Sequence, residues 1–176
     1  PPRTQDGLQY GPVADAATSA SMLELMTKLG DDLGANPEVD MDPAVLREVW
    51  HEDMIWWGPA GIGSNMSIQG FKDQHQKPYR HSLYDERYFE GHRASFAEGD
   101  YGGWVGWPSL KERVTKGGFL GMAATNDFAT QRVIDIYRRE NGKMAENWVF
   151  IDLLDYLWQL DVDPLKRMRE MQRRRV

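Results

Sequence analysis

The residues best suited to chemistry lie on two strand-like runs between Gln131 and Leu160, joined by Glu140-Asn141-Gly142-Lys143. Asn-Gly between alternating runs predicts a type I′ hairpin turn, because both central residues of that turn need a positive φ. With Asn141 and Gly142 as the loop, the expected cross-strand pairs are Glu140 with Lys143, Tyr137 with Glu146, Asp135 with Trp148, and Val133 with Phe150.

This register predicts a hairpin with one apolar face and one face that carries carboxyl groups among aromatic rings. Side chains alternate along a strand, so the second face holds Asp135, Tyr137, Glu146 and Trp148. Burial in an apolar pocket raises the pKa of a carboxyl group, which can then take a proton next to a carbonyl and later return it. We therefore expect Asp135 to be a general acid/base. A structural ion pair or hydrogen-bond network is the alternative role for Asp135 and for Glu146.

Acid/base chemistry at a carbonyl also needs a hydrogen-bond donor for the developing negative charge. His92 is expected opposite Trp107 on a second hairpin with the loop Gly99-Asp100, and it is the second candidate catalytic residue. Tyr137 is another candidate donor, and His75 could reach the pocket from a helix or pack as an ordinary buried histidine. The expected apolar walls for a ring-containing ligand are Trp56, Trp107 and Trp148.

The elements that position these residues follow an α+β order. Helical patterns are expected from about Thr18 to Leu33, from Asp42-Pro43 to about His51, and from Gly70 to Pro78. A short strand, Met54–Trp57, precedes the third helix, and long antiparallel strands follow it. Glycines at 102, 103 and 106 are costly in a strand unless a neighbour packs closely or the sheet bends. The sequence therefore predicts helices packed on one face of a strongly curved antiparallel sheet.

The composition limits the class of protein. The length of 176 residues predicts one domain over 18–163, with a loose arm over 1–17 and a basic tail over 164–176. A net charge of −6 argues against nucleic acid as the partner, and no run of 18 apolar residues indicates a membrane helix. The chain has no Cys, which excludes thiol catalysis and fits a cytoplasmic location. No secretory signal pattern is recognised at the start.

No cofactor or metal is expected. The Gly-rich segment 58–65 lacks the Gly-Lys-Ser/Thr ending of a phosphate loop. The adjacent residues His51, Glu52 and Asp53 do not converge on one ion as a spaced pair would. The expected partner is a small-molecule substrate.

Three segments together resemble the SnoaL-like polyketide cyclase family, within the NTF2-like superfamily. They are Trp56-Trp57-Gly58-Pro59-Ala60-Gly61, Thr115-Lys116-Gly117-Gly118-Phe119-Leu120-Gly121, and Asp135-Ile136-Tyr137-Arg138 followed by Gly142-Lys143-Met144-Ala145-Glu146-Asn147-Trp148. The resemblance covers roughly residues 40–160. It implies a cone-shaped α+β barrel, with a curved sheet wrapped around helices and one deep apolar pocket. It also implies a homodimer or higher homo-oligomer.

The resemblance implies a cofactor-independent enzyme of the cyclase, isomerase, dehydratase or hydrolase type. Its pocket Asp, matched here by Asp135, would act as general acid/base on a small to medium apolar carbonyl compound. The alternative is a non-catalytic pocket protein that binds a small molecule, suggested by Lys116 where family members often have His. A purely oligomeric adaptor is a third possibility, which the carboxyl-bearing hairpin face disfavours.

Overall fold

A computed structural model describes residues 15–35, 43–59, 61–79, 84–117 and 119–174 of the chain. The N-terminal half of the described chain contains three helical segments: α1 (Ala16–Ala35), α2 (Pro43–Val49), and α3 (Ser67–Phe71) continued by the π-helical turn η1 (Lys72–Gln76). Most of the predicted N-terminal arm lies outside the described residues. Helix α1 begins before the predicted Thr18, because the Asp15 carboxylate accepts a hydrogen bond from the Thr18 backbone N–H (2.7 Å) and caps the helix.

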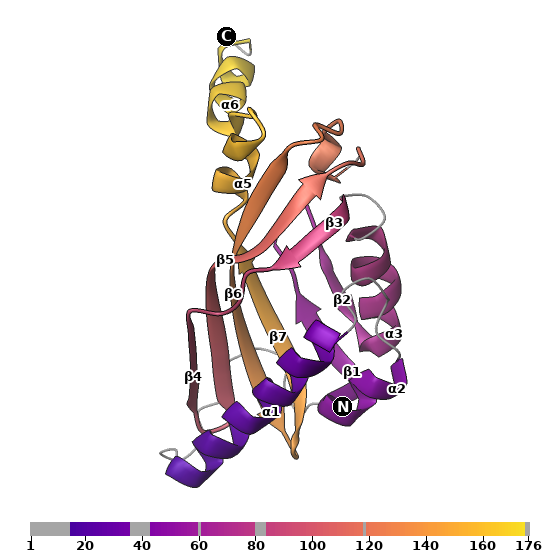
Figure 1. Cartoon of the computed structure of the whole chain (residues 1–176), viewed down its shortest axis with the longest axis vertical. Coiled ribbons are helices and arrows are strands. Elements are labelled where there is room, and N and C mark those ends of the chain that lie inside the picture. The colour runs from indigo at the N-terminus through magenta and orange to yellow at the C-terminus, as the bar shows by residue number, and fades with distance from the viewer. Residues whose placement is uncertain (1–14, 36–42, 60, 80–83, 118, 175–176) are drawn as a thin grey trace.

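The strands form one curved sheet, and the helices α1, α2 and α3 lie against one side of it (Figure 1). The strands are β1 (Trp50–Trp57), β2 (Ser64–Met66), β3 (Tyr84–Phe89), β4 (Ala94–Glu98), β5 (Tyr101–Val114), β6 (Phe128–Glu140) and β7 (Lys143–Ile151). Their order is β2-β1-β7-β6-β5-β3, with β4 also pairing with β5, and β1 runs parallel to β7. The predicted α+β fold with N-terminal helices on a curved sheet is confirmed. Among the described strands, β2 and β3 at the two ends of this order do not pair with each other, so the sheet is not closed.

The β6–β7 hairpin has the predicted turn but not the predicted register. Asn141 and Gly142 have φ values of 50° and 81°, as a type I′ turn requires, and Glu140 pairs with Lys143. Beyond Arg139, which pairs with Met144, a bulge at Ala145 adds one residue to β7.

The bulge makes the predicted pairs wrong by one residue. Arg138 now faces Glu146, Tyr137 faces Asn147, and Asp135 faces Val149. A one-residue slip moves side chains to the opposite face of a strand. Asn147 and Val149 therefore share the face of Asp135, whereas Glu146 and Trp148 do not.

Strand β5 contains the glycines that the sequence flagged. A Cβ atom on Gly102 would lie 2.5 Å from the Met26 sulfur, so this glycine allows α1 to pack closely on the sheet. A second irregularity interrupts the β5–β6 register between Gly106 and Leu110. The Gly99-Asp100 loop between β4 and β5 is confirmed, since Glu98 pairs with Tyr101.

The core lies between the helices and the concave sheet. It is built largely from fully buried side chains of α1, α2 and the facing strands: Met22, Met26, Leu29, Leu46, Val49, Met54 and Met144.

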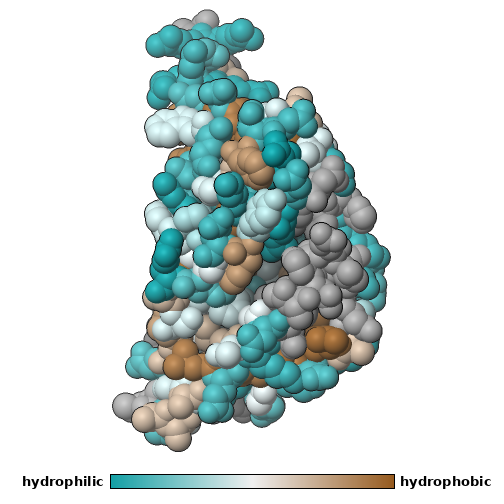
Figure 2. Space-filling view, viewed as in Figure 1, coloured by the Kyte–Doolittle hydropathy of each residue, from teal (hydrophilic) through white to brown (hydrophobic). Residues whose placement is uncertain are grey.

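At the C-terminus, helix α5 (Leu153–Gln159) and helix α6 (Pro164–Arg173) follow the last strand. Asp163 caps α6 by accepting a hydrogen bond from the Lys166 backbone N–H (2.8 Å), and α6 buries none of its residues. Figure 2 shows α6 as a mainly hydrophilic tip of the molecule. In the described part of the chain, no helix is long and apolar enough to cross a membrane.

Candidate functional site

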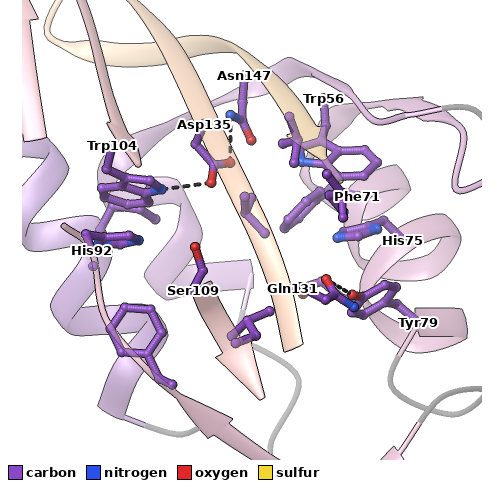
Figure 3. A pocket seen from close by; sticks show the side chains of 18 of the residues that line it. Trp56, Phe71, His75, Tyr79, His92, Trp104, Ser109, Gln131, Asp135 and Asn147 are labelled. Carbon is purple, nitrogen blue, oxygen red and sulfur yellow. Dashed lines mark hydrogen bonds between the residues drawn. The ribbon is translucent and has the colours of Figure 1, made fainter. Parts of the chain in front are cut away.

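A cavity of about 470 Å³ lies between the helices and the sheet. Two groups of aromatic side chains make much of its wall, with polar side chains of β5, β6 and β7 between them (Figure 3). The first group comes from β1, the α3–η1 segment and the helical turn that follows it: Trp56, Phe71, His75 and Tyr79. The second comes from β3, the β3–β4 connection and β5: Phe89, His92 and Trp104. The arrangement suits a flat, mainly apolar ligand with a few polar groups.

Asp135 projects from β6 into this cavity and accepts three hydrogen bonds. The Trp104 indole N–H donates to its Oδ2 (2.8 Å), and the Asn147 side-chain amide donates to its Oδ1 (3.3 Å). The Tyr137 hydroxyl also donates to it. Burial raises the pKa of Asp135 to about 6, although these three hydrogen bonds oppose the rise. The pKa of Asp135 thus lies closer to neutral pH than that of an exposed Asp.

The neighbours of Asp135 are held in place by packing. Trp104 contacts the Tyr137 ring edge-on at a centroid distance of 5.1 Å, and Trp50 packs on Tyr137 at 5.8 Å. The Asn147 amide also donates to the Ile136 carbonyl oxygen (3.2 Å), which fixes its orientation. Burial and the adjacent Asp135 carboxylate raise the pKa of Tyr137 well above its usual value, so Tyr137 stays a hydrogen-bond donor.

His92 reaches the cavity, but not through the predicted pairing with Trp107. Strand β4 begins only at Ala94, and the His92 ring stacks on Trp104 at a centroid distance of 4.3 Å. Burial lowers the pKa of His92, because the charged imidazolium is poorly solvated there. A neutral His92 can donate one hydrogen bond and accept another. Its ring lies on the same side of the cavity as the indole that contacts Asp135 (Figure 3).

His75 lies across the cavity from His92 (Figure 3). Its ring stacks on Trp56 at a centroid distance of 3.8 Å and contacts Phe71 at 5.2 Å. The predicted placement of Phe71 and His75 on one helical face is therefore confirmed, and both line the cavity.

Three predicted site residues do not line the cavity. Trp107 is 49% exposed, and its ring contacts the Arg132 guanidinium (4.9 Å). Glu146 is fully buried, and its Oε2 accepts a hydrogen bond from the Arg138 Nε (2.5 Å). Trp148 pairs with Trp57 of β1. The bulge at Ala145 places Glu146 and Trp148 on the face opposite Asp135.

Sequence reasoning missed several polar side chains of the cavity. Asn147 follows Glu146 in the hairpin motif, and the correct register would have identified it. Ser109 and Gln131 left no sequence signal, because one lies beside a strand irregularity and the other forms hydrogen bonds to residues distant in sequence. Within the described residues, no three His, Cys, Asp or Glu side chains are grouped so as to hold a metal ion.

Comparison with known proteins identifies the class of fold. The family model described as SnoaL-like polyketide cyclase matches residues 112–160, which include β6 and β7. A comparison with proteins of curated function found no match to this chain.

Solved structures with the same fold have low sequence identity. An NTF2-like protein from Burkholderia xenovorans LB400 has a TM-score of 0.60 and 17% identity over 80% of this chain and 96% of that one. TsrD from Streptomyces laurentii has a TM-score of 0.58 and 23% identity over 80% and 95% of the two chains. IdmH from Streptomyces antibioticus, a candidate polyketide cyclase, has a TM-score of 0.60 and 16% identity over 80% and 99%. The chain thus has the NTF2-like fold, and its residues 112–160 match the SnoaL-like polyketide cyclases.

Proposed function

We propose that the cavity is the active site of a cyclase-type enzyme in which Asp135 acts as general acid/base on an apolar carbonyl compound. The observation that carries this proposal is the position of Asp135: its carboxyl lines an aromatic cavity, and burial raises its pKa to about 6. A base with this pKa is largely ionised at neutral pH and still basic enough to accept a proton. The family match supports the cyclase type of function.

The proposed reaction starts with proton transfer from carbon. Asp135 takes a proton from the carbon next to a substrate carbonyl, and the C–H electron pair forms a C=C bond while the carbonyl π pair moves to oxygen. The His92 N–H donates a hydrogen bond to that oxygen. The enolate carbon then attacks a second carbonyl of the same molecule and forms a C–C bond. The new alkoxide receives the proton that Asp135 holds, so the carboxylate is regenerated.

The first step can be tested without the natural substrate. A naphthyl methyl ketone has acidic protons next to its carbonyl, and NMR in deuterium oxide measures their exchange. We expect the wild-type protein to accelerate this exchange and Asp135→Asn to reduce the acceleration by about 10²- to 10⁴-fold, the usual size of a general-base contribution.

The matched control is Asp127→Asn, which changes an exposed carboxyl group before β6. This variant should exchange the ketone protons at the wild-type rate. If Asp135→Asn exchanged the ketone protons as fast as the wild-type protein, Asp135 would not be the general base.

The alternative is a cavity that binds a small molecule without converting it. The three hydrogen bonds that Asp135 already accepts favour this alternative, because they reduce its affinity for a proton. Binding of the ketone with no accelerated exchange by the wild-type protein would support it. Recovery of a bound natural ligand in unchanged form would support it further.

A further inference from the structure

The cavity contains a second set of polar side chains that the acid/base proposal does not use. Ser109, on β5, is only 4% exposed, and its hydroxyl finds no hydrogen-bond partner among the described residues. Gln76, in η1, is 7% exposed, and its Oε1 likewise has no partner in the described part of the chain. Both residues line the cavity. A buried polar atom without a partner is costly, so a ligand group that forms a hydrogen bond with either atom would be favoured in this cavity.

Two further polar residues of the cavity, Tyr79 and Gln131, form a hydrogen bond with each other. The Tyr79 hydroxyl donates to Gln131 Oε1 (2.5 Å), and both residues line the cavity. Tyr79 lies three positions after Gln76 on the same helical segment, which places them on neighbouring turns. Gln131 pairs across the sheet with Leu110, the residue after Ser109. Figure 3 shows Ser109 and Gln131 in the part of the cavity beyond Asp135, away from Asn147.

The local backbone places the Ser109 hydroxyl inside. The β5–β6 register is interrupted between Gly106 and Leu110, and such irregularities often redirect a side chain near a site. A Cβ atom on Gly106 would collide with Ser109 Oγ at 1.8 Å. The glycine therefore makes room for this hydroxyl.

A hydrogen bond to the buried Glu112 carboxyl group fixes the orientation of the Gln131 amide. Glu112 is fully buried, and its Oε1 accepts hydrogen bonds from Gln131 Nε2 (2.6 Å) and from the Tyr156 hydroxyl (2.9 Å). With Gln131 Nε2 directed at Glu112, its Oε1 receives the Tyr79 proton. The Tyr79 oxygen can then only accept a further hydrogen bond.

We propose that Gln76, Tyr79, Ser109 and Gln131 form a second polar site that binds a hydroxyl group of the ligand away from Asp135. The Gln76 Oε1 can only accept a hydrogen bond, so the ligand group must donate one. The Ser109 hydroxyl can donate in return. A ligand carbonyl or carboxylate has no hydrogen to donate and cannot supply this bond. The inference rests on the proposed function, since it takes the ligand to be a carbonyl compound, and it adds a hydroxyl group at the distant end.

Three matched probes test the inference by calorimetric titration. They are a naphthyl methyl ketone, the same ketone with a hydroxyl group on the distal ring, and the methyl ether of that hydroxyl compound. We expect the wild-type protein to bind the hydroxyl compound about threefold to tenfold more tightly than the plain ketone, as one or two neutral hydrogen bonds allow. The ether, which cannot donate, should bind no better than the plain ketone.

The preference should depend on the proposed residues. Ser109→Ala combined with Gln76→Leu should bring the affinity ratio of hydroxyl compound to ketone close to one, and Ser109→Ala alone should reduce it. Retained binding of the plain ketone shows that these variants are folded. Ser95→Ala and Gln69→Leu, which change exposed residues of the same types, should keep the wild-type ratio.

The binding preference for the hydroxyl compound can be tested independently of the acid/base role of Asp135. Asp135→Asn should keep the hydroxyl preference, because the preference is a binding property of the other end of the cavity. Wild-type protein that does not distinguish the ketone from its hydroxyl derivative, including failure to bind either, would overturn the inference. So would an ether that binds as tightly as the hydroxyl compound, or a preference that the double variant retains.

Discussion

Asp135 and Glu112 are both carboxyl groups whose pKa is raised by burial, yet their surroundings differ. Burial raises the pKa of Asp135 to about 6 and that of Glu112 to about 7. Asp135 lines the cavity, whereas Glu112 is enclosed by Gln131 and Tyr156 and does not line it. The comparison shows that a raised pKa reports burial, and that only access to a cavity makes the group available to a ligand.

Glu146 extends the comparison to a carboxyl group enclosed by opposite charge. Its Oε2 accepts from Arg138 Nε (2.5 Å), and Arg138 Nη1 also contacts Glu140 (3.0 Å). Glu146 stands eleven positions after Asp135 on the same hairpin, but the bulge turns it away from the cavity. One hairpin thus carries a candidate acid/base group on one face and a buried ion pair on the other.

The largest expected stability effect distinguishes the ion pair from the cavity carboxyl. Glu146→Gln removes the buried carboxylate that pairs with the buried Arg138 guanidinium, so the free energy of unfolding should fall by about 3 kcal/mol. Urea unfolding measures this change. The matched control, Glu52→Gln, breaks an exposed pair with Arg47 and should cost less than about 1 kcal/mol. Equal losses in the two variants would contradict a structural role for Glu146.

Stability should depend on pH through Glu112. Its pKa is raised from 4.5 to about 7, so between these values the folded state holds a proton that the unfolded state has lost. The free energy of unfolding therefore falls as the pH rises through this range, by up to about 3 kcal/mol for this group. Asp135 contributes in the same direction between its ordinary value of 3.8 and about 6.

Glu112→Gln should remove part of this pH dependence. Relative to wild type, the variant should gain stability steadily from about pH 4.5 to pH 7 and no further above that, as urea unfolding at several pH values would show. A constant difference across this range would mean that the Glu112 carboxyl is not protonated in the folded state.

The pH profile of ketone proton exchange should follow Asp135 and not Glu112. The rate should rise about tenfold per pH unit below pH 6 and level off above it, because only the ionised carboxylate accepts a proton. Glu112→Gln should leave this inflection near pH 6. An inflection near pH 7 that disappears in Glu112→Gln would mean that Glu112, and not Asp135, is the base in this exchange.

The smallest effect concerns the unpartnered hydroxyl of the cavity. Ser109→Ala removes a buried polar atom that has no partner among the described residues, so it should stabilise the ligand-free protein by about 1 kcal/mol. Thermal unfolding measures the change, with the exposed Ser95→Ala as the control. Destabilisation by Ser109→Ala would indicate that its hydroxyl supports the fold.

Much of the fold could be predicted from local signals. Asn141, Gly142 and Gly99 mark their turns, because Asn and Gly tolerate the positive φ values that these turns need. Asp163 and Pro164 likewise open α6, since an Asp cap followed by Pro at the first helical position is a local start signal. The placement of Asp135, His92, His75 and Trp56 around one cavity agrees with the sequence analysis. Their roles in binding or catalysis remain predictions.

The sequence by itself determined the elements, the turns and the carboxyl group to examine. Only the tertiary structure decided which residues surround it. The alternating sequence pattern does not reveal the bulge at Ala145, which places Asn147 and Val149 beside Asp135 in place of Glu146 and Trp148. The start of β4 at Ala94 likewise moved His92 onto Trp104. An alternating strand pattern predicts two faces. Each bulge adds a residue to the strand, however, and moves the side chains that follow it to the opposite face.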